Sequence, residues 1–573
     1  MQVMCLAMQL PDNVSISLEG ILMSENISRR GFIVGATAGA GVLAAGATTA
    51  MAEEAPSYMP ANWDFECDFL VIGYGGAGLW GCLCGADECG MEVVALEKAP
   101  VRGGGNTSIN MGEFTVVNDI DGFAQYMRGF SKGMIPEAVC QAWANEAARN
   151  VEYMNRYGIE PVDLGGSMAS GFTRSCEYPQ FDPNQPDGWS MSIYRYSWDY
   201  NGAYGWEILD QARADLGVEV KFGCHDEELI QNPVTKEILG AYFYMGEDET
   251  RYAIKARKGV LLSTGGFEFN EEMQNESLKC YPARGMYGWP FNTGDGHKMA
   301  FAVGAAPWAM REMIGADTCN FPNNPYKYAI MASPNSDNYL DVTRTGKRWH
   351  NEMGGFDPHN GWHPYMNWDN SICDFDRIPT WIIFDQKGLD GGPLGPMANS
   401  GSMQMWLKDL PEECGAFGGW SEDNSKELEM GWIKKGNTLE ELAADMANPD
   451  AFVDDKMDVE TLKATIEHWN EMIANGVDDE FGRKIEGLEP LEPPFYAMPK
   501  YPGGCTTLGG PKKNENAQIL DGAGNPIPRL YGAGSMCNCH NHTYGISGGG
   551  NAENMVFGRI AARHAASLDS WDA

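Results

Sequence analysis

Short apolar runs next to glycine clusters mark the first part of this chain. The run from Asp68 to Ile72 is followed at once by Gly73-Tyr-Gly-Gly-Ala-Gly78 and then by a helical stretch. A short apolar run bounded by glycines predicts a buried parallel strand. A second run, Met91 to Leu96, predicts the neighbouring strand. This order of strand, tight turn, helix and strand is typical of an α/β domain that binds a dinucleotide.

The same pattern returns further along the chain. Val260 to Thr264 is another apolar run that ends in glycines, and Leu530 to Gly534 precedes a glycine-rich helix start at Gly548. Between them, Thr438 to Glu441 has the spacing of a capping box, and Val459 to Met472 has apolar residues at helical intervals. We therefore expect strands of one sheet from both ends of the chain, and structural helices in the segment between them.

The first glycine cluster has the spacing of a dinucleotide-binding fingerprint. Gly73 permits the turn, Gly75 lets the backbone approach a pyrophosphate, and Gly78 lets the helix pack closely on the strand. The helix N-terminus then faces the phosphates. Glu97 ends the second strand, where an acidic side chain accepts hydrogen bonds from ribose hydroxyls. An ordinary carboxylate at a strand end is the alternative interpretation of Glu97.

Further glycine-rich segments favour FAD over NAD. Gly103 to Ser108 supplies flexible backbone and small hydroxyls for a pyrophosphate or flavin. The helix that opens after Gly548 directs its N-terminal dipole at the flavin ring. A second NAD-type fingerprint is absent from the sequence. The residues predicted to bind FAD are Gly73, Gly75, Gly76, Ala77, Gly78, Glu97, Lys98, Gly104, Gly105, Asn106, Thr107, Ser108, Thr264, Gly265, Gly266, Asp295, Gly534, Gly549, Gly550, Asn551 and Ala552.

The N-terminal segment carries targeting signals. Ser28-Arg-Arg-Gly-Phe32 precedes a run rich in glycine and alanine, Ile33 to Ala50, and Ala50-Met-Ala52 fits a cleavage site. The run has too few large apolar residues for a transmembrane helix. We expect residues 1–52 to be a twin-arginine signal peptide. Recognition by the Tat export machinery would send the folded protein to the periplasm or cell envelope.

Charge and cysteine content narrow the partners and cofactors. The chain has 79 acidic and 41 basic side chains, and its formal net charge of -38 repels nucleic acid and anionic lipid. Its 15 cysteines lack the dense, even pattern of a disulfide scaffold, so most are expected to be buried thiols. A 4Fe-4S or zinc centre is the alternative, because the cysteines cluster at positions Cys82, Cys84, Cys89, Cys537 and Cys539.

A series of motifs resembles one flavoprotein superfamily. They are GYGGAG, GGGNTS, STGGF, NTGDG, GKRWHNE, TWIIFD, TLEEL, CTTLGG and YGAGS, spread from about Asp68 to the C-terminus. Their order resembles the fumarate reductase and succinate dehydrogenase flavoproteins, with the urocanate reductases and 3-ketosteroid dehydrogenases. The resemblance implies an α/β, Rossmann-like FAD-binding domain at 64–271 and 500–573. It also implies an inserted α+β cap domain at 272–499 that closes over the flavin.

Three positions depart from the fumarate reductase pattern. The acid arginine that follows the Asn-Glu motif aligns with Phe356, and the histidine pair before the T-M-G-G motif aligns with Cys505-Thr506. The arginine just before the last glycine-rich helix aligns with Ser547. Because arginine geometry suits carboxylates, these changes argue against fumarate as the substrate.

The segment His542-Thr-Tyr-Gly-Ile-Ser-Gly548 resembles the ketosteroid dehydrogenase segment that holds the substrate ketone. The resemblance assigns the two donors to the Tyr544 hydroxyl and the Gly548 backbone N–H. Donors aimed at a carbonyl oxygen stabilise the enolate, each by about 2.7 to 4 kcal/mol in a dry site. Packing of Tyr544 beside the flavin is the alternative.

The proton-transfer residue must act opposite the hydride across the C=C bond. We predict Tyr339, with His350 as a second candidate, because both lie in the cap stretch that approaches the flavin in relatives. A hydrogen-bonded structural role is the alternative for His350. Arg344 and His542 are further candidates, whereas Arg348 is expected to be structural.

Together these features predict an FAD-dependent oxidoreductase that acts on CH–CH groups. It would reduce or form an activated C=C bond in an enone-type, steroid-like substrate by hydride transfer at flavin N5. An external cytochrome or flavin protein, or a membrane-associated electron-transfer protein, would exchange the electrons. One alternative is an enoate reductase for urocanate or cinnamate, with Arg344 or Arg284 on the carboxylate. Others are a cardiac-glycoside-type lactone reductase and a non-catalytic flavin electron-transfer subunit.

Overall fold

The protein was analysed as a computed structural model. It describes residues 58–165, 176–198, 202–286, 288–321, 329–353, 359–395, 419–447, 456–540 and 543–573. The predicted signal peptide, residues 1–52, lies outside the described residues, and so do Phe356 and His542.

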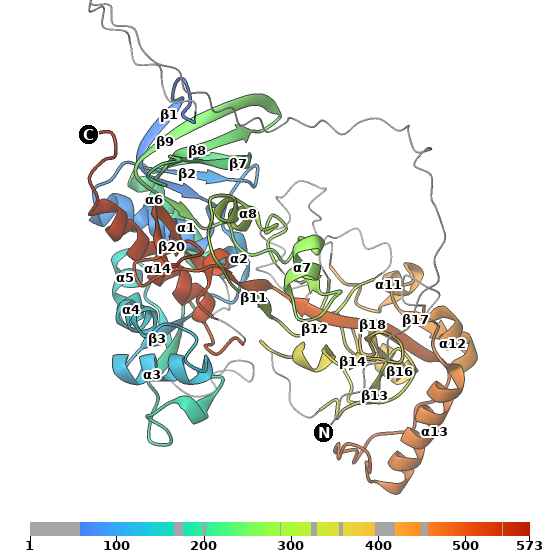
Figure 1. Ribbon diagram of the computed structural model, residues 1–573. Coiled ribbons are helices and arrows are strands. Elements are labelled where there is room, and N and C mark those ends of the chain that lie inside the picture. Colours follow the sequence, from blue (N-terminus) through green and yellow to red (C-terminus); the bar gives the residue numbers. More distant parts are fainter. Residues whose placement is uncertain are drawn as a thin grey trace, which may run out of the picture. The chain divides into compact units, whose positions relative to one another are not determined.

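A mainly parallel sheet carries the glycine-rich segments (Figure 1). In spatial order its strands are β20 (Gln518–Leu520), β21 (Pro526–Gly532), β9 (Asp248–Leu262), β1 (Phe65–Ile72), β2 (Val93–Glu97) and β6 (Glu219–Phe222). Two further strands, β7 (Cys224–Gln231) and β8 (Ile238–Met245), extend from β9 as an antiparallel meander. The predicted strand at Asp68 to Ile72 is confirmed as β1, which is buried on both faces, as a central parallel strand requires.

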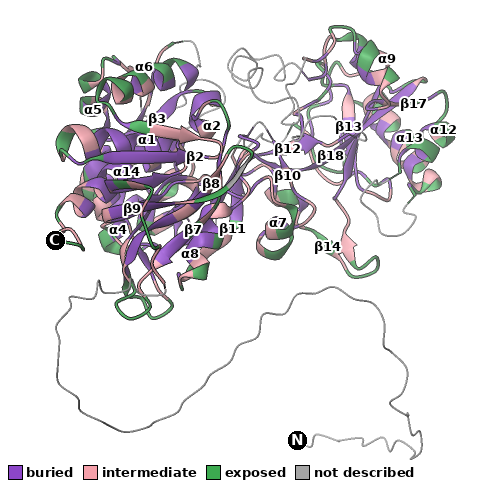
Figure 2. Ribbon diagram, turned by 90° about the horizontal axis from the view of Figure 1, so that it is seen from above, coloured by how far each residue is buried: buried purple, intermediate pink, exposed green. Residues whose placement is uncertain are grey.

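The two ends of the chain meet in this sheet. In β21, Leu530 pairs in parallel with Val260 of β9. Helix α14 (Gly549–Ala566) then packs on α1 (Gly76–Leu83), the helix of the first glycine cluster. Their backbones approach closely, since a Cβ added to Gly558 would lie 2.7 Å from the Ala77 carbonyl oxygen. Figure 2 shows both helices as largely buried, so the C-terminal helix is a core element.

Smaller elements cover the sheet around these two helices. A three-stranded sheet has the order β3-β5-β4. These elements are η1 (Cys84–Glu88), α2 (Gly105–Ile109), β3 (Glu113–Val117), α3 (Ile120–Phe130), α4 (Glu137–Ala147), α5 (Asn150–Arg156), β4 (Val162–Gly165), η2 (Pro179–Phe181), β5 (Met191–Arg195), α6 (Gly202–Asp215) and η6 (Gly534–Cys537). The strands β11 (Pro307–Ile314) and β19 (Thr506–Pro511) form a separate antiparallel pair, and helix α8 (Asp295–Ala302) precedes β11 in the chain.

The predicted cap segment contains a second, mixed sheet. Its strands are β10 (Arg284–Gly285), β18 (Phe495–Gly504), β16 (Thr380–Asp385) and β13 (Tyr339–Val342), with β12 (Asp317–Cys319) and β17 (Lys434–Gly436) also paired to β18. The predicted boundary between 499 and 500 falls inside β18. Beyond it, Lys500 still pairs with Thr380 and Gly504 with Gly285, so the cap sheet continues to Gly504.

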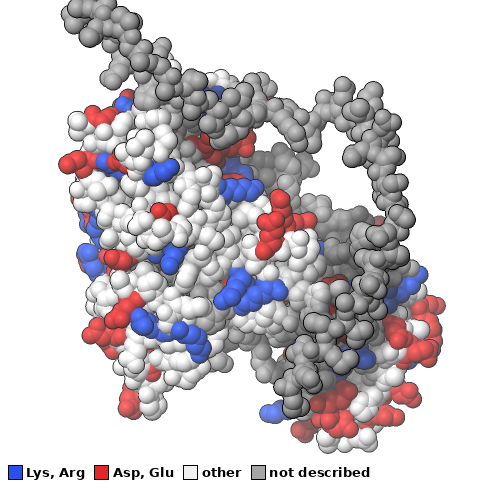
Figure 3. Space-filling view, viewed as in Figure 1, with Lys and Arg blue, Asp and Glu red and all other residues white. Residues whose placement is uncertain are grey.

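The two helices predicted between 438 and 472 are confirmed. In α12 (Leu439–Asp445), the Thr438 side chain accepts the Glu441 N–H at 3.2 Å, as in a capping box. The Glu441 carboxylate reaches back to the N–H of Asn437, one residue before the cap. Helix α13 (Val459–Asn475) buries one face, and acidic side chains gather over α12 and α13 in Figure 3.

The remaining cap elements are short. They are α7 (Glu271–Ser277), η3 (His363–Tyr365), β14 (Trp368–Asp369), β15 (Asp374–Phe375), α9 (Gln386–Asp390) and α11 (Ser425–Glu429). Mixed helices and strands on both sides of the insertion confirm the α/β class with an α+β cap. In the described part of the chain, no helix combines the length and apolar character needed to cross a membrane.

Candidate active site

A pocket opens where the parallel strands of the main sheet end. Ligands of open α/β sheets bind outside the carboxyl ends of the strands, so this is the expected place for a cofactor. The pocket is lined by Gly73, Gly75, Gly76, Ala77, Glu97, Lys98, Gly105, Asn106, Thr107, Glu227, Ser263, Thr264, Gly265, Trp289, Phe291, Asn292, Asp295, Gly534, Ser535 and Asn554. Thirteen of these residues were predicted from the sequence to bind FAD.

The three fingerprint glycines have different physical requirements. Gly73 has a φ of +93°, and a Cβ there would lie 2.6 Å from the Thr264 Cα. A Cβ at Gly78 would lie 2.2 Å from the Gly73 carbonyl oxygen. Both glycines are therefore required by the fold.

Neither the backbone conformation of Gly75 nor its contacts with the rest of the protein require a glycine at this position. Its φ is −97°, and the nearest atom to an added Cβ is the Gly105 Cα at 3.7 Å. Gly75 and Gly105 both line the pocket. The space that a side chain would fill is therefore open for a ligand. The cradle fits a pyrophosphate lying close to the backbone.

Glu97 lies at the end of β2 and faces the pocket. Its two carboxylate oxygens accept the backbone N–H groups of Tyr74 and Ala99, both at 2.8 Å. Burial raises the pKa of Glu97 to about 7, although both N–H groups oppose this. Next to it, Lys98 Nζ lies 2.8 Å from Asp295 Oδ2. This polar end of the pocket is suited to ribose hydroxyls.

The raised pKa of Glu97 predicts a pH dependence of FAD binding. Without FAD the pKa of about 7 exceeds the ordinary value of 4.5, so Glu97 supports the fold best below pH 4.5 and loses this contribution as pH rises through 7. Ribose hydroxyls donate to the charged carboxylate and favour its deprotonated form. FAD binding should therefore release a proton in this range and tighten as pH rises toward 7.

Titration of the apoprotein with FAD at stepped pH, followed by flavin fluorescence, checks this expectation. Glu97→Gln should remove most of the slope. Glu227 also lines the pocket, and burial raises its pKa to about 7, so Glu227→Gln shows how much of the slope remains when Glu97 is the carboxylate left. A wild-type affinity that stays constant between pH 5 and 7 would contradict the assignment.

The segment predicted as flexible backbone, Gly103 to Ser108, instead begins helix α2. Asn106 within it joins the pocket to the cap: its Oδ1 accepts the Trp289 N–H at 2.6 Å and its Nδ2 donates to the Cys505 carbonyl at 2.7 Å. Gly104 and Gly105, at the start of this helix, adopt positive φ angles that glycine tolerates because it has no Cβ.

A buried carboxylate lies behind this end of the pocket. Glu268 accepts hydrogen bonds from Asn292 Nδ2 at 2.6 Å, Asn106 Nδ2 at 3.2 Å and the Thr507 N–H at 3.2 Å. Burial raises the pKa of Glu268 to about 7. Its acceptor sites thus orient Asn106 and Asn292, two of the asparagines that line the pocket.

Eight predicted FAD ligands are not part of the pocket lining. Asn551 and Ser108 are satisfied internally: Asn551 Nδ2 donates to the Glu113 carbonyl at 2.7 Å, and Ser108 Oγ to the Gly105 carbonyl at 3.1 Å. The eight residues are Gly78, Gly104, Ser108, Gly266, Gly549, Gly550, Asn551 and Ala552.

Some lining residues were not singled out in the sequence. Asn554 lies one turn beyond Gly550 on α14, a helical spacing that could have revealed it. Asn292 begins the NTGDG motif and could have been read from it. Trp289, Phe291 and Glu227 come from loops and strands whose path depends on the folded cap and meander, so no local signal marks them.

Tyr544 lies beside the start of α14 in an apolar cluster with Ile314 and Leu508. Its hydroxyl oxygen accepts the Gly550 N–H at 3.0 Å, and its ring stacks on His540 with centroids 5.2 Å apart. Burial raises the pKa of Tyr544, so the phenol stays protonated. Within the described residues, no acceptor receives the Tyr544 proton. The predicted donor Gly548 is the N-cap of α14, with a φ of +69°.

The positions that hold carboxylates in fumarate reductases carry no cation here. Cys505 Sγ donates to the Ile314 carbonyl at 3.4 Å. Ser547 Oγ donates to Glu177 Oε1 at 2.6 Å. The third position, Phe356, lies outside the described residues. The two described positions therefore offer hydrogen-bonding and apolar groups rather than an anion site.

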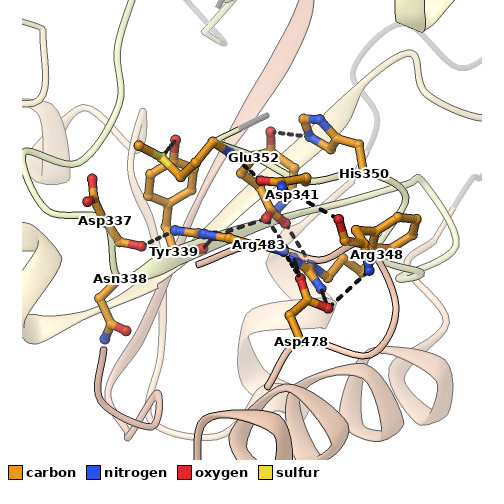
Figure 4. Close-up of polar contacts among 12 residues, drawn as sticks. Asp337, Asn338, Tyr339, Asp341, Arg348, His350, Glu352, Asp478 and Arg483 are labelled. Carbon is orange, nitrogen blue, oxygen red and sulfur yellow. Dashed lines mark hydrogen bonds and ion pairs between the residues drawn. The ribbon is translucent and has the colours of Figure 1, made fainter. Parts of the chain in front are cut away.

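Tyr339 and His350 lie within the cap, outside the pocket lining (Figure 4). The Tyr339 hydroxyl donates to Met353 Sδ at 4.0 Å. His350 Nε2 lies 3.1 Å from Asp341 Oδ2, and the ring stacks on Trp349. The catalytic roles of Tyr339 and His350 stay predictions. The contacts of His350 fit the alternative, a hydrogen-bonded structural role.

A buried ion network explains why this part of the cap is ordered. Glu352 Oε2 accepts from Arg348 Nη2 and Arg483 Nη1, both at 2.9 Å, and Arg348 also pairs with Asp478 at 2.8 Å. Arg483 Nη1 donates to the Tyr339 carbonyl at 2.7 Å. Mutually paired charges of this kind fix a loop against the cap helices, which is the structural role expected for Arg348.

The thiols of Cys537 and Cys539 bind to different partners. Cys537 Sγ donates to the Pro511 carbonyl at 3.0 Å, whereas Cys539 Sγ donates to Glu553 Oε2 at 3.4 Å. Among the residues that the structure describes, no group of three or more His, Cys, Asp or Glu side chains could hold a metal ion. The 4Fe-4S hypothesis gains no site from these residues.

Three features together define a dinucleotide-binding flavoprotein. They are the parallel sheet, the open space beside Gly75 and Gly105, and the carboxylate of Glu97 at the end of β2. The chain belongs to the FAD binding domain family, which matches residues 68–319 and 329–552.

Two relatives and one solved structure illustrate the similarity. The digoxin reductase of Eggerthella lenta is 26% identical, over 96% of this chain and 99% of that protein. The 3-oxosteroid 1-dehydrogenase of Mycobacterium tuberculosis is 26% identical, over 87% of this chain and 98% of that protein. A 3-ketosteroid delta1-dehydrogenase from Sterolibacterium denitrificans has a TM-score of 0.67 at 20% identity, over 88% of this chain and 99% of that chain.

These similarities confirm the superfamily and the cofactor. The protein is an FAD-dependent oxidoreductase of the class that acts on CH–CH groups, with a small-molecule substrate. The resemblance to the fumarate reductase and 3-ketosteroid dehydrogenase superfamily is confirmed as well.

Proposed function

We propose that this enzyme reduces an activated C=C bond in a neutral, enone-type substrate with a steroid-like skeleton. The observation that carries the proposal is the buried Tyr544 hydroxyl, which accepts the Gly550 N–H and keeps its own proton for a substrate oxygen. The relatives named as a digoxin reductase and a 3-oxosteroid 1-dehydrogenase support a substrate of this class.

Residues of the chain would stabilise the charge that develops on the substrate during the reaction. FAD, when bound, supplies or accepts the hydride. Tyr544 donates a hydrogen bond to the substrate carbonyl, which stabilises the negative charge that develops on the oxygen. The Gly550 N–H orients the phenol for this purpose. Ile314 and Leu508 exclude water from the same side, so the hydrogen bond acts in a low-dielectric site.

The positions of Arg344 and Arg284 give less support to an enoate substrate, whose carboxylate these arginines were predicted to bind. Arg344 Nη1 already pairs with Asp374 Oδ2 at 2.6 Å. Arg284 lies over the Tyr501 ring, 5.2 Å from its centroid. In the described part of the chain, neither arginine lines the FAD pocket or packs against Tyr544. A carboxylate substrate would therefore lack the bidentate partner that it needs.

A steady-state assay with reduced viologen as the electron donor tests the proposal. The panel contains a steroid dienone, cyclohexenone, an unsaturated lactone, urocanate and cinnamate. Consumption of viologen with the enones but not the enoates supports the proposal. Turnover confined to urocanate or cinnamate would favour the enoate alternative. No turnover with any compound would favour the electron-transfer subunit.

We propose further that the protein is exported by the Tat pathway and receives electrons from an external cytochrome or flavin protein. The twin arginines Arg29 and Arg30 and the Ala50-Met-Ala52 site support export. Replacing both arginines by lysine should leave full-length, flavin-containing protein in the cytoplasmic fraction, as measured by fractionation and immunoblotting. An unchanged distribution of the double variant would rule the signal out.

A further inference from the structure

One turn of π-helix brings two cysteines together at the end of α1. In η1 the Cys89 N–H donates to the Cys84 carbonyl at 3.1 Å, five residues back. Side chains five residues apart diverge by about 140° on an α-helix, whereas the i→i+5 bond of a π turn places them side by side. The two thiols accordingly hydrogen-bond to each other. Single π turns of this kind are rare and occur frequently at functional sites.

The two thiols differ in their exposure and in their acidity. Cys84 is 1% exposed, and its Sγ lies 3.6 Å from the carbonyl oxygen of Arg559 on α14. Cys89 is partly exposed. The hydrogen bond that the thiols share raises the pKa of Cys84 and lowers the pKa of Cys89. Cys89 is therefore the thiol that ionises first and that an external reagent can reach.

Charged side chains from three elements face this pair. Glu88 of η1 and Arg563 of α14 act on both thiols, and Lys258 of β9 acts on Cys89. The Arg563 Nε atom lies 3.2 Å from Glu88 Oε2, so the carboxylate that would oppose a thiolate is itself paired. The two cations favour a negative charge on the Cys89 sulfur.

The other described cysteines have different surroundings. Cys373 is exposed, between β14 and β15, and is the expected competitor for a thiol reagent. Cys5 and Cys414 lie outside the described residues. Burial raises the pKa of the remaining thiols, which are Cys67, Cys82, Cys140, Cys176, Cys224, Cys280, Cys319, Cys505, Cys537 and Cys539.

We propose that Cys84 and Cys89 are a redox-active pair that forms a reversible disulfide across the π turn. A disulfide joins residues whose Cα atoms are about 4.4 to 6.8 Å apart, a separation that suits two residues linked by a backbone N–H···O bond. Neither cysteine is among the described residues that line the FAD pocket. The proposal therefore depends neither on the substrate nor on the direction of the flavin reaction.

The oxidation balances with a low-molecular-weight disulfide as the oxidant. The Cys89 thiolate attacks one sulfur of the oxidant, whose S–S bond breaks, so that a mixed disulfide forms and one thiolate leaves. Cys84 then loses its proton and attacks the Cys89 sulfur, which expels the second half of the oxidant as a thiolate. The pair has lost two electrons and two protons, and the oxidant has become two thiols. An external dithiol reverses the reaction.

Peptide mapping of the folded holoprotein after oxidation by glutathione disulfide tests the pairing. Free thiols are alkylated first, and a glutamate-specific protease then cleaves after Glu66, Glu88 and Glu92. Cleavage after Glu88 puts Cys84 and Cys89 on different peptides. We expect the two peptides to stay joined after oxidation, with a mass about 2 Da below the sum of the reduced peptides. Dithiothreitol should separate them.

Four variants identify the partners. Cys82 lies on the same peptide as Cys84, so the link should survive in Cys82→Ser and be lost in Cys84→Ser. It should also be lost in Cys89→Ser and survive in Cys373→Ser, the control for the exposed thiol. In Cys84→Ser, Cys89 should retain one glutathione, because the thiol that resolves the mixed disulfide is missing.

Flavin content before and after oxidation shows whether the folded protein reacts. It should be unchanged, because the pair lies outside the pocket lining. Wild-type peptides that separate without dithiothreitol would overturn the proposal. A link that persists in Cys84→Ser, or one that forms only as flavin is lost, would overturn it as well.

Discussion

Replacing Gly75 with alanine is expected to yield a folded protein that no longer retains FAD. The added Cβ would meet no protein atom closer than 3.7 Å, and the φ of −97° suits alanine. The methyl group would instead enter the pocket where the backbone must approach the pyrophosphate. We expect FAD affinity to fall by at least about 100-fold, or about 2.8 kcal/mol. Flavin content after purification and titration of the apoprotein measure the loss.

Two other glycines provide the controls. At Gly522, an exposed position, no atom lies within 4 Å of an added Cβ, so Gly522→Ala should retain full flavin content. Gly78→Ala places its Cβ 2.2 Å from a backbone carbonyl and should lower the folding yield. If Gly75→Ala binds FAD as tightly as the wild type, the cradle does not hold the pyrophosphate at that point.

Tyr544→Phe is expected to lower turnover of carbonyl-conjugated substrates by about 100- to 1000-fold. In the proposed mechanism the buried hydroxyl donates to the substrate oxygen, so its loss would remove the stabilisation of the enolate. KM should change less than kcat, because the hydrogen bond strengthens as charge develops in the transition state. Steady-state kinetics with the best enone of the panel measures both constants.

Tyr531→Phe is the matched control for this variant. Tyr531 is also a buried tyrosine of the FAD-binding domain, and its hydroxyl bonds to His564 at 2.9 Å, outside the pocket lining. It should keep near wild-type kcat. The melting temperature of Tyr544→Phe should also be recorded, because the variant leaves the Gly550 N–H without its acceptor. Unchanged enone turnover in Tyr544→Phe would contradict the donor role.

Local patterns made the cofactor half of this protein predictable. The turn at Gly73, the strand that ends in Glu97 and the helix after Gly548 are encoded within short stretches, because glycine and apolar runs act on their own backbone. Helix α2 lies where flexible backbone was predicted, and Gly104 and Gly105 at its start hold positive φ angles that glycine tolerates. This conformation accompanies pairing with the neighbouring glycine segment, where Gly75 and Gly104 form a bridge.

The substrate half was less accessible from the sequence. Tyr544 was identified from a resemblance carried by adjacent residues. His359 contacts Glu177, and its neighbour Asn360 contacts Tyr544, yet each pair is separated by about a third of the chain and no periodicity or spacing links them. They meet because β11 and β19 pair and bring the end of the cap to the start of α14. Such long-range contacts follow from the tertiary fold, which single-sequence patterns do not contain.

Anaerobic single turnover tests the central claim most directly. Fully reduced protein, freed of excess dithionite, is mixed with the steroid dienone in the absence of any other electron source. We predict that the absorbance of oxidised flavin returns and that each flavin yields one molecule of product with the C=C bond saturated. Flavin that stays reduced, or that is reoxidised without saturated product, would contradict the assignment of a C=C reductase.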